Sequence, residues 1–263
     1  MRDKQPKIIP AERREKIERI LQGRQFVSSS ELCNLIDASE STVRRDLEQL
    51  EDQGILERVH GGAILTQHVN TESLYKHSRL KNENEKQRIA ERACSMIEEN
   101  DVVFLNHGTT TSMIAQVLAK NNVFKNVTVI SSNLGVMNAL FESDINFICL
   151  GGALRTKSLS LTGAMTIENL ACFISNKCFI GVDGIDVRYG CTYFTVQDAD
   201  VTKQMARNTH GQIHVVADHE KWGTVSPYSA VPFSRISSFI TGVELNENIS
   251  SVFEENGVSL LRV

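Results

Sequence analysis

Two neighbouring arginines stand out in the stretch STVRRDLEQLEDQGILERVHGGA, which runs from Ser41 to Ala63. Arg44 and Arg45 lie near the start of a predicted helix, and guanidinium groups are well suited to binding phosphate or carboxylate. The chain has 28 Lys and Arg against 32 Asp and Glu, a net charge of −4, so it is not a general binder of polyanions. If the arginines bind an anion, they therefore do so as a local patch.

The two arginines share one face of the predicted helix with Ser41 and Thr42, away from the apolar side chains of Val43 and Leu47. An arginine can bridge phosphates or pair with guanine through two hydrogen bonds, and hydroxyl groups can bond phosphate oxygens. The alternative is that the arginines are ordinary surface residues paired with neighbouring carboxylates. The charge pattern alone leaves both interpretations open.

A second candidate is the stretch VVFLNHGTTTS over residues 102–112, where a predicted strand runs into a hydroxyl-rich turn that opens a helix. Backbone amides at a helix N-terminus favour anions, and the threonine hydroxyls add hydrogen-bond donors. Gly108 would let the backbone approach a ligand closely. The alternative is that the threonines only start the helix.

Further polar residues and glycines follow other predicted strands: Ser132, Asn133, Gly151, Gly152, Asp183, Gly184, Asp218 and Lys221. In a parallel sheet these strand ends meet at one edge, which is where ligands usually bind. Threonine and lysine suit a phosphate, and asparagine and aspartate suit sugar hydroxyls. The sequence therefore predicts an anion-binding pocket at this edge.

The N-terminal region has the helix spacing of a small DNA-binding fold. Apolar periodicity and capping residues predict three helices and then a hairpin, at residues 11–22, 29–36, 40–54 and 55–65. The second helix is expected to bury Leu32, Leu35 and Ile36. Two short helices joined by a tight turn, at about residues 27–48, form the helix-turn-helix arrangement, whose second helix enters the major groove. The hairpin would be a wing, with Arg58 and His60 at the DNA backbone or minor groove.

The rest of the chain alternates predicted strands and helices. After a polar linker over 66–81 and a helix over 83–100, strands are predicted at 102–105, 127–131, 146–150, 178–182, 213–217 and 238–241. Helices are predicted at 110–120, 134–142, 197–209 and 247–256. Such units indicate an α/β fold with a mostly parallel sheet covered on both faces. The expected organisation is a winged helix-turn-helix domain over 1–65, the linker, and an α/β domain over 82–263.

The composition excludes several other classes of protein. The six cysteines form no CxxC pair, which indicates buried thiols in a reducing cytosol, and no apolar run approaches the ~18 residues of a membrane span. The histidines and cysteines lack metal-ligand spacing, and there is neither a Walker loop nor a dinucleotide glycine fingerprint. We therefore expect a cytoplasmic protein without a metal or cofactor and without a membrane partner.

The first quarter of the chain resembles a known family. The segment ERREKIERILQGRQFVSSSELCNLIDASESTVRRDLEQLEDQGILERVHGGA is similar to the N-terminal domain of DeoR/GlpR-type transcriptional regulators, with only packing departures at Ala38 and Val43. The resemblance favours the DNA interpretation of the arginine pair. The expected contacts with double-stranded operator DNA come from Ser39, Ser41, Thr42, Arg44, Arg45, Arg58 and His60.

The resemblance continues in the motifs NEKQRIAERA, NHGTTT, GVDGID, DADVTKQM and ADHEKWG. These are similar to the effector domain of the same family, which is related in fold to ribose-5-phosphate isomerase, senses phosphorylated sugars or related metabolites, and usually works within an oligomer. By position, the threonines and Lys221 would hold phosphate, with Asp183 near the sugar. The expected effector site comprises Asn106, Gly108, Thr109, Thr110, Thr111, Asn133, Gly152, Asp183 and Lys221.

Two residues depart from the family pattern at this site. The family usually has aspartate where Asn106 stands, and a small residue where His107 stands. Asparagine keeps the acceptor but loses the charge. His107 is expected to be a helix-entry residue near solvent, and its presence leaves the identity of the effector open.

The main alternative is a sugar-phosphate isomerase, which would need a carboxylate base and a group that stabilises an enediolate. The isomerase motif resembles Asp-Gly-Ala-Asp-Glu followed by a lysine and a glycine run, whereas this chain has DGIDV from Asp183, without the glutamate or that run. We therefore predict a binding pocket with no catalytic residues. The expected protein is a repressor of carbohydrate-metabolism genes, a homodimer or tetramer, controlled by a phosphorylated sugar or sugar acid. A protein that only oligomerises is a third interpretation.

Overall fold

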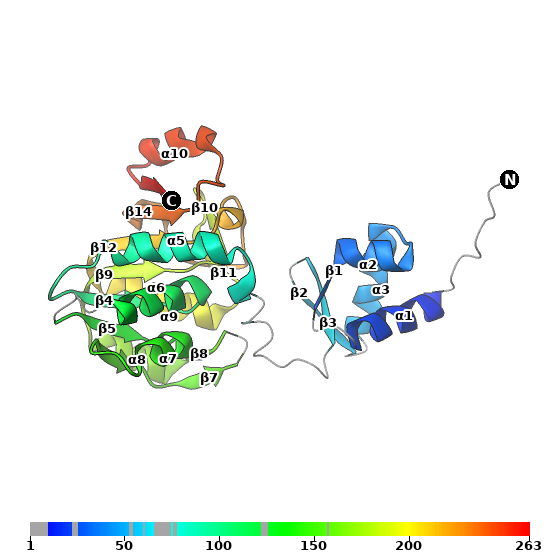
Figure 1. Cartoon of the computed structure of the whole chain (residues 1–263), viewed down its shortest axis with the longest axis horizontal. Helices are drawn as coiled ribbons and strands as arrows, with labels where there is room; N and C mark the ends of the chain where they lie inside the picture. The colour runs from blue at the N-terminus through cyan, green and yellow to red at the C-terminus, as the bar shows by residue number, and fades with distance from the viewer. Residues whose placement is uncertain are drawn as a thin grey trace. The chain divides into compact units, whose positions relative to one another are not determined.

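The computed structural model describes residues 10–22, 26–52, 55–59, 61–65, 75, 78–121, 126–156 and 158–263. The chain divides into two units, Met1–Leu74 and Tyr75–Val263, and Figure 1 shows both. The division falls inside the stretch that the sequence predicts to be a linker.

The first unit consists of three helices and a small antiparallel sheet. Its elements are α1 Pro10–Gln22, β1 Val27–Ser28, α2 Ser29–Ile36, α3 Glu40–Asp52, β2 Leu56–Val59 and β3 Gly62–Leu65, with strand order β1-β3-β2. Ser28 caps α2, because its Oγ accepts a hydrogen bond from the Glu31 amide at 3.1 Å. The turn between α2 and α3 begins at Asp37, whose left-handed backbone (φ 51°) ends α2. These features confirm a helix-turn-helix followed by a hairpin.

The core of the first unit is formed by the apolar faces of its helices. Fully buried members are Ile17, Leu21, Leu32, Ile36, Val43, Leu47 and Leu50. Leu35 was also expected inside, but it is 38% exposed. At about 100° per residue, Leu35 lies at the edge of the helix face that Leu32 and Ile36 form, so its side chain stays partly exposed.

The second unit is built on one parallel sheet of seven strands, in the order β15-β14-β12-β9-β4-β5-β6. The strands are β4 Val102–Leu105, β5 Thr128–Ser131, β6 Asn146–Cys149, β9 Ser175–Ile180, β12 Thr209–Val216, β14 Ser238–Thr241 and β15 Ser259–Arg262. The helices are α5 Glu83–Cys94, α6 Thr109–Lys120, α7 Leu134–Leu140, α8 Ala164–Ala171, α9 Val196–Arg207 and α10 Ser250–Glu255. The predicted α/β architecture is therefore confirmed.

The sheet is covered on both faces, and successive residues of each strand point to opposite layers. Val103 and Leu105 pack with α5, α6 and α7, which lie together on one side in Figure 1. Phe104, between them in sequence, packs with residues of α8, α9 and α10 on the other face. This double burial explains why the strands read as continuous apolar runs.

Several elements of the second unit were not predicted from the sequence. They are α8, β15, the hairpin β7 Ala153–Arg155 with β8 Ser160–Thr162, and a small antiparallel sheet of β10 Gly184–Asp186, β11 Gly190–Tyr193 and β13 Tyr228–Val231. The helix predicted over 83–100 ends at Cys94. Ser95 contributes to this ending, because its Oγ donates back to the Arg92 carbonyl at 2.7 Å.

The order of strands creates a switch point between β4 and β9. From β4 the chain passes through α6 to β5 on one side, whereas from β9 it passes through α9 to β12 on the other side. The two connections leave in opposite directions and on opposite faces of the sheet. A crevice therefore opens beyond the carboxyl ends of these two strands.

Candidate functional site

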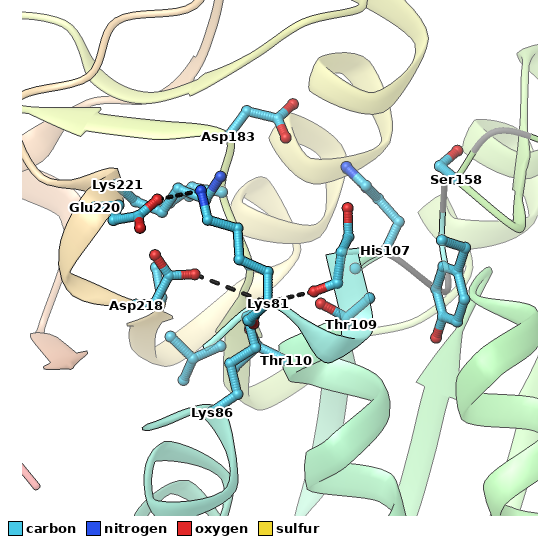
Figure 2. Close-up of a pocket in the computed structure, with 17 residues that line it drawn as sticks. Lys81, Lys86, His107, Thr109, Thr110, Ser158, Asp183, Asp218, Glu220 and Lys221 are labelled. Atoms are coloured by element: carbon cyan, nitrogen blue, oxygen red, sulfur yellow. Dashed lines mark hydrogen bonds and ion pairs between the residues drawn. The ribbon is translucent and has the colours of Figure 1, made fainter. Parts of the chain in front are cut away.

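A cavity of about 200 Å³ lies at this switch point. Its walls come from the segment before α5, the turns after β4, β9 and β12, and Ser158 of the β7–β8 hairpin. Figure 2 shows the polar side chains that converge on it. Of the residues expected at the effector site, the ones that line this cavity are Gly108, Thr109, Thr110, Asp183 and Lys221.

The N-terminus of α6 forms one wall of the cavity through Thr109 and Thr110. The first amides of a helix have no acceptor within the helix, so they are available to a bound anion. Gly108 precedes them with a φ of 128°, a conformation that side chains on Cβ disfavour. The expected role of this glycine as the entry to an anion-binding turn is therefore consistent with its backbone.

Two of the expected effector residues, Thr111 and Asn133, build this wall rather than face the cavity. Thr111 Oγ1 donates to the Asn106 carbonyl at 2.8 Å, and Asn133 Nδ2 donates to the Gly108 carbonyl at 3.0 Å. Asn133 also caps α7, since its Oδ1 accepts from the Gly135 amide at 2.8 Å. These buried side chains use their polar atoms to hold the turn, so neither of them lines the cavity.

Asn106 joins the turn after β4 to the turn after β9. It is fully buried; its Nδ2 donates to the Gly181 carbonyl at 2.9 Å and its Oδ1 accepts from the Gly181 amide at 2.8 Å. This paired contact fixes the floor of the crevice. Gly152, the remaining expected residue, lies elsewhere: a Cβ there would be 1.9 Å from Thr166 Oγ1, so its small size serves packing against α8.

Lysines and carboxylates face each other at one end of the cavity, as Figure 2 shows. Lys81 forms an ion pair with Glu220, and Lys86 Nζ lies 3.8 Å from Asp218 Oδ2. Burial would raise the pKa of Glu220, but the hydrogen bond and charge of Lys81 outweigh it and lower that pKa. In the described part of the chain, Lys221 has no carboxylate partner for its Nζ. A ligand can therefore bind Lys221 without breaking an ion pair with a described carboxylate.

Lys86 and Asp218 form the buried floor at this end. Lys86 Nζ donates to the carbonyls of Ser78 at 2.6 Å and Lys81 at 2.7 Å. Burial lowers the pKa of Lys86, and Asp218 opposes that shift. Asp218 is only 3% exposed, and its Oδ1 has no hydrogen-bond partner among the described residues. An unpaired buried carboxylate oxygen is costly, so a donor from a ligand would be favoured there.

His107 faces the cavity, and the expectation that it lies near solvent is wrong. It is 9% exposed, with its ring centroid 5.3 Å from that of Tyr193. Its Nε2 lies 3.9 Å from Oδ1 of Asp198, a buried carboxylate that Thr195 and Arg155 also contact. The packing of Tyr193 beneath the turn holds the histidine inward.

Several cavity residues were not expected from the sequence: Tyr75, Ser78, Lys81, Lys86, Ser158 and Glu220. Three of them, Tyr75, Ser78 and Lys81, lie in the polar stretch that the sequence predicts to be a linker. This stretch has no helical or strand periodicity that could have indicated a role for them. Lys86 lies within the motif NEKQRIAERA, which is the signal that could have identified it.

The expected DNA-contacting residues gather on α3 and the hairpin of the first unit. Ser41, Arg44 and Arg45 are exposed, while Thr42 is half-buried. Ser39 Oγ precedes the helix and accepts from the Thr42 amide at 3.4 Å. His60 lies outside the described residues.

Carboxylates neutralise the arginine face only in part. Glu48 Oε1 lies 3.3 Å from Arg44 Nε and 3.0 Å from Arg58 Nη1. Asp46 points inward and pairs with Arg13 of α1, whose Nη2 donates to Asp46 Oδ1 at 3.0 Å. Within the part of the chain that the structure describes, Arg45 has no carboxylate partner. The surface thus keeps a cationic group free for an external anion.

Comparison with known families agrees with this two-part architecture. Residues 13–69 match the family described as "DeoR-like helix-turn-helix domain", and residues 81–243 match the "DeoR C terminal sensor domain". The chain belongs to the DeoR family. As a DeoR-type transcriptional regulator it combines a DNA-binding domain with a sensor domain.

Similar full-length relatives support the assignment. The "Uncharacterized HTH-type transcriptional regulator FruR" of Bacillus subtilis (strain 168) is 33% identical over 83% of this chain and 86% of its own. The "HTH-type transcriptional repressor GlcR" of the same organism is 33% identical over 89% of each chain. The "Glycerol-3-phosphate regulon repressor" of Escherichia coli (strain K12) is 27% identical over 89% of this chain and 92% of its own. All three names describe regulators, in agreement with the DeoR interpretation rather than the isomerase one.

Among solved structures, a D-ribose-5-phosphate isomerase in complex with phospho-erythronic acid is similar with a TM-score of 0.41. Its sequence is 17% identical, over 53% of this chain and 54% of that chain. A likeness this distant supports no inference about activity. Across the described helices of this DeoR-family protein, none has both the length and the apolar character needed to cross a membrane.

Proposed function

We propose that this DeoR-family protein represses carbohydrate-metabolism genes by binding operator DNA, and that a phosphorylated sugar or sugar acid in the cavity controls that binding. The observation that carries the proposal is the cavity itself. It combines a helix N-terminus with a lysine and a buried carboxylate oxygen that have no partner among the described residues, all within one small volume. The relatives named as repressors support the sign of the regulation, and the glycerol-3-phosphate regulon repressor among them supports a phosphorylated ligand.

The phosphate of the ligand would bind at the start of α6. There the amides of the first turn, the hydroxyls of Thr109 and Thr110, and Lys221 supply donors and positive charge. The charges of the cavity side chains cancel, because the three lysines equal the three carboxylates in number. The lysines are Lys81, Lys86 and Lys221, and the carboxylates are Asp183, Asp218 and Glu220. The preference for an anion therefore depends on the helix terminus and on Lys221 rather than on net charge.

The hydroxyl groups of the sugar would bind at the carboxylates. Asp218 Oδ1 lacks a donor among the described residues, and a hydroxyl would satisfy it. Asp183 Oδ2 accepts from the Phe194 amide at 2.9 Å, which holds that carboxylate in place beside the cavity. A polyol phosphate thus matches both ends, whereas an apolar ligand would leave Asp218 unsatisfied.

The DNA contacts would come from the first unit. Helix α3 would enter the major groove with Ser41, Thr42, Arg44 and Arg45, after a phosphate contact from Ser39. Arg58 and His60 of the hairpin would reach the backbone or minor groove. Two copies in a homo-oligomer would read a two-fold symmetric operator, as helix-turn-helix dimers do.

A thermal-shift screen tests the ligand. Glycerol 3-phosphate, glucose 6-phosphate, fructose 1-phosphate and ribose 5-phosphate are each compared with the unphosphorylated parent. At 100 times its Kd a ligand stabilises the native state by about 2.7 kcal/mol, which is an easily measured rise in Tm. At least one phosphate should raise Tm while its parent does not, and Lys221→Met should remove the response. Lys203→Met, at an exposed lysine of α9, is the matched control.

A gel shift with the upstream DNA of the protein's own operon tests the regulator. The compound found in the screen should weaken operator binding. Absence of binding to any promoter fragment at moderate salt, with or without these compounds, would exclude the proposal. Turnover of a sugar phosphate in a spectrophotometric isomerase assay would instead favour the enzyme interpretation.

A further inference from the structure

Tyr75 is the first residue of the second unit, and it lines the candidate effector cavity. Its hydroxyl donates a hydrogen bond to Ser112 Oγ at 2.7 Å. Ser112 belongs to the first turn of α6, the helix whose N-terminus forms the proposed phosphate site. The residue that follows the end of the first unit is therefore attached directly to the wall of the cavity.

Ser112 links this contact to the turn that presents the helix terminus. Its Oγ donates to the Gly108 carbonyl at 2.8 Å and accepts from Asn133 Nδ2 at 3.0 Å. A hydroxyl has one donor and two acceptor positions, so the bond from Tyr75 completes its set. Any movement of the Gly108 turn on ligand binding would change the geometry of these bonds, including the one to Tyr75.

Gly135 provides the space that the tyrosine hydroxyl occupies. A Cβ built on Gly135 would lie 2.2 Å from Tyr75 Oη and 2.4 Å from Ser112 Oγ. Gly135 is the second residue of α7 and has no left-handed backbone. Its conformation does not require glycine, so the room needed by Tyr75 and Ser112 is the physical reason for it.

We infer that Tyr75 transmits occupancy of the cavity to the chain segment that leads to the DNA-binding unit. The inference rests on the proposed function. A ligand can shift an equilibrium only through contacts that differ between two states. Tyr75 supplies such a contact, because it lines the cavity while its hydroxyl is bonded to Ser112 in the first turn of the helix that would hold the phosphate. Tyr75 is thus a positioning residue for regulation rather than a source of ligand affinity.

The first test separates coupling from ligand binding. Tyr75→Phe removes the hydroxyl, and Gly135→Ala fills the space that it needs. For each variant the operator Kd is measured with and without the phosphorylated compound that gives the largest thermal shift, and the Kd of that compound is measured by calorimetry. An allosteric ligand typically changes the operator Kd by about 5- to 150-fold. Both variants should reduce this ratio towards 1, and in Tyr75→Phe, which leaves Ser112 in place, the Kd of the compound should change far less.

Two controls match these substitutions. Tyr228→Phe alters a tyrosine that is 42% exposed, and Gly151→Ala adds a methyl group whose nearest neighbour would be 3.4 Å away. Neither should change the ratio. If Tyr75→Phe or Gly135→Ala keeps the wild-type ratio, the inference is overturned.

A second measurement does not depend on DNA. Hydrogen exchange of the peptide from Tyr75 to Lys86 is followed with and without inorganic phosphate as the probe. Phosphate should change the exchange rate in the wild type but not in Tyr75→Phe. An unresponsive wild-type peptide overturns the inference. A responsive peptide in a protein that binds no promoter fragment would instead overturn the proposed function and leave the role of Tyr75 intact.

Discussion

Asn106 shows how a single polar side chain can serve the site without touching a ligand. The sequence placed it among the effector residues, because it follows a buried strand in the motif NHGTTT. In the structure both ends of its amide bond to the backbone of Gly181. Sequence reasoning identified the right turn but could not tell a residue that holds the turn from one that faces the cavity, since that depends on strand pairing.

Replacing Asn106 by aspartate tests this role. The carboxylate would face the Gly181 carbonyl, where the amide now donates at 2.9 Å, in a fully buried place. We expect Asn106→Asp to lower the free energy of unfolding by roughly 2–4 kcal/mol at neutral pH. Burial raises the pKa of such an acid, so the loss should be smallest near pH 4 and should grow as the pH rises. Chemical denaturation from pH 4 to 8 measures it; an equal loss at all pH values would contradict the charge argument.

The arginine pair of α3 is also a prediction at the residue scale. Replacing Arg44 and Arg45 together by alanine should abolish operator binding in a gel shift, because both side chains are exposed and would contact DNA. Tm should stay close to that of the wild type, since neither residue is in the core. The control is Arg92→Ala, at an exposed arginine of α5 in the second unit. Retained operator affinity in the double variant would assign the contact to other residues.

At the scale of elements, the position of the site follows from the order of the strands. The sequence predicted six of the seven parallel strands and placed the polar residues at their carboxyl ends. It could not supply the strand order, because strand order depends on long-range pairing between β4 and β9, which are separated by three intervening helices. The antiparallel pieces β7, β8, β10, β11 and β13 were missed for another reason. They are only three or four residues long and, unlike the equally short β4, they do not form continuous apolar runs.

One contact between elements predicts a pH-dependent stability. Glu85 of α5 accepts hydrogen bonds from His219 Nδ1 and from the His219 amide, both at 2.8 Å, and from the Gly242 amide at 3.0 Å. Partial burial lowers the pKa of His219, but the hydrogen bond and charge of Glu85 outweigh it, so the pKa is raised. The resulting stabilisation is fully present below the unfolded pKa of about 6.5 and is lost as the pH rises through the raised folded value.

His219→Asn should therefore be less stable than the wild type below about pH 6.5, and the difference should shrink as the pH rises past the folded pKa. Tm measured across this range tests the effect. His210→Asn, at an exposed histidine of β12, should show no such trend. A Tm difference that is constant with pH would mean that the ring packs but does not titrate against Glu85.

At the scale of the whole molecule, the chain consists of two units with separate cores. Asp46 belongs only to the first of them: it is 2% exposed and bonds Arg13 of α1 from α3. Asp46→Ala would remove the buried carboxylate that pairs with Arg13, and with it the contact at 3.9 Å to Arg14 Nη1. The free energy of unfolding of the first unit should fall by roughly 2–4 kcal/mol.

Differential scanning calorimetry should resolve this as a change in one transition. Asp46→Ala should lower the Tm of the first unit alone, while a phosphorylated ligand should raise the Tm of the second unit alone. Asp52→Ala, at an exposed position of α3, should leave both transitions unchanged. A single transition that moves with both perturbations would show that the units unfold as one.

The crevice at the switch point has a consequence for how such regulators diversify. It exists because two crossovers diverge, and no lining side chain is needed to open it. Lys81, Asp183 and Lys221 each stand on a different connecting segment, and none belongs to a core cluster. If these residues bind the ligand as proposed, exchanging them one at a time would alter the ligand preference while the scaffold stays unchanged. A new ligand preference could therefore arise from a few substitutions in the turns of the second unit, while the DNA-binding unit stays unchanged.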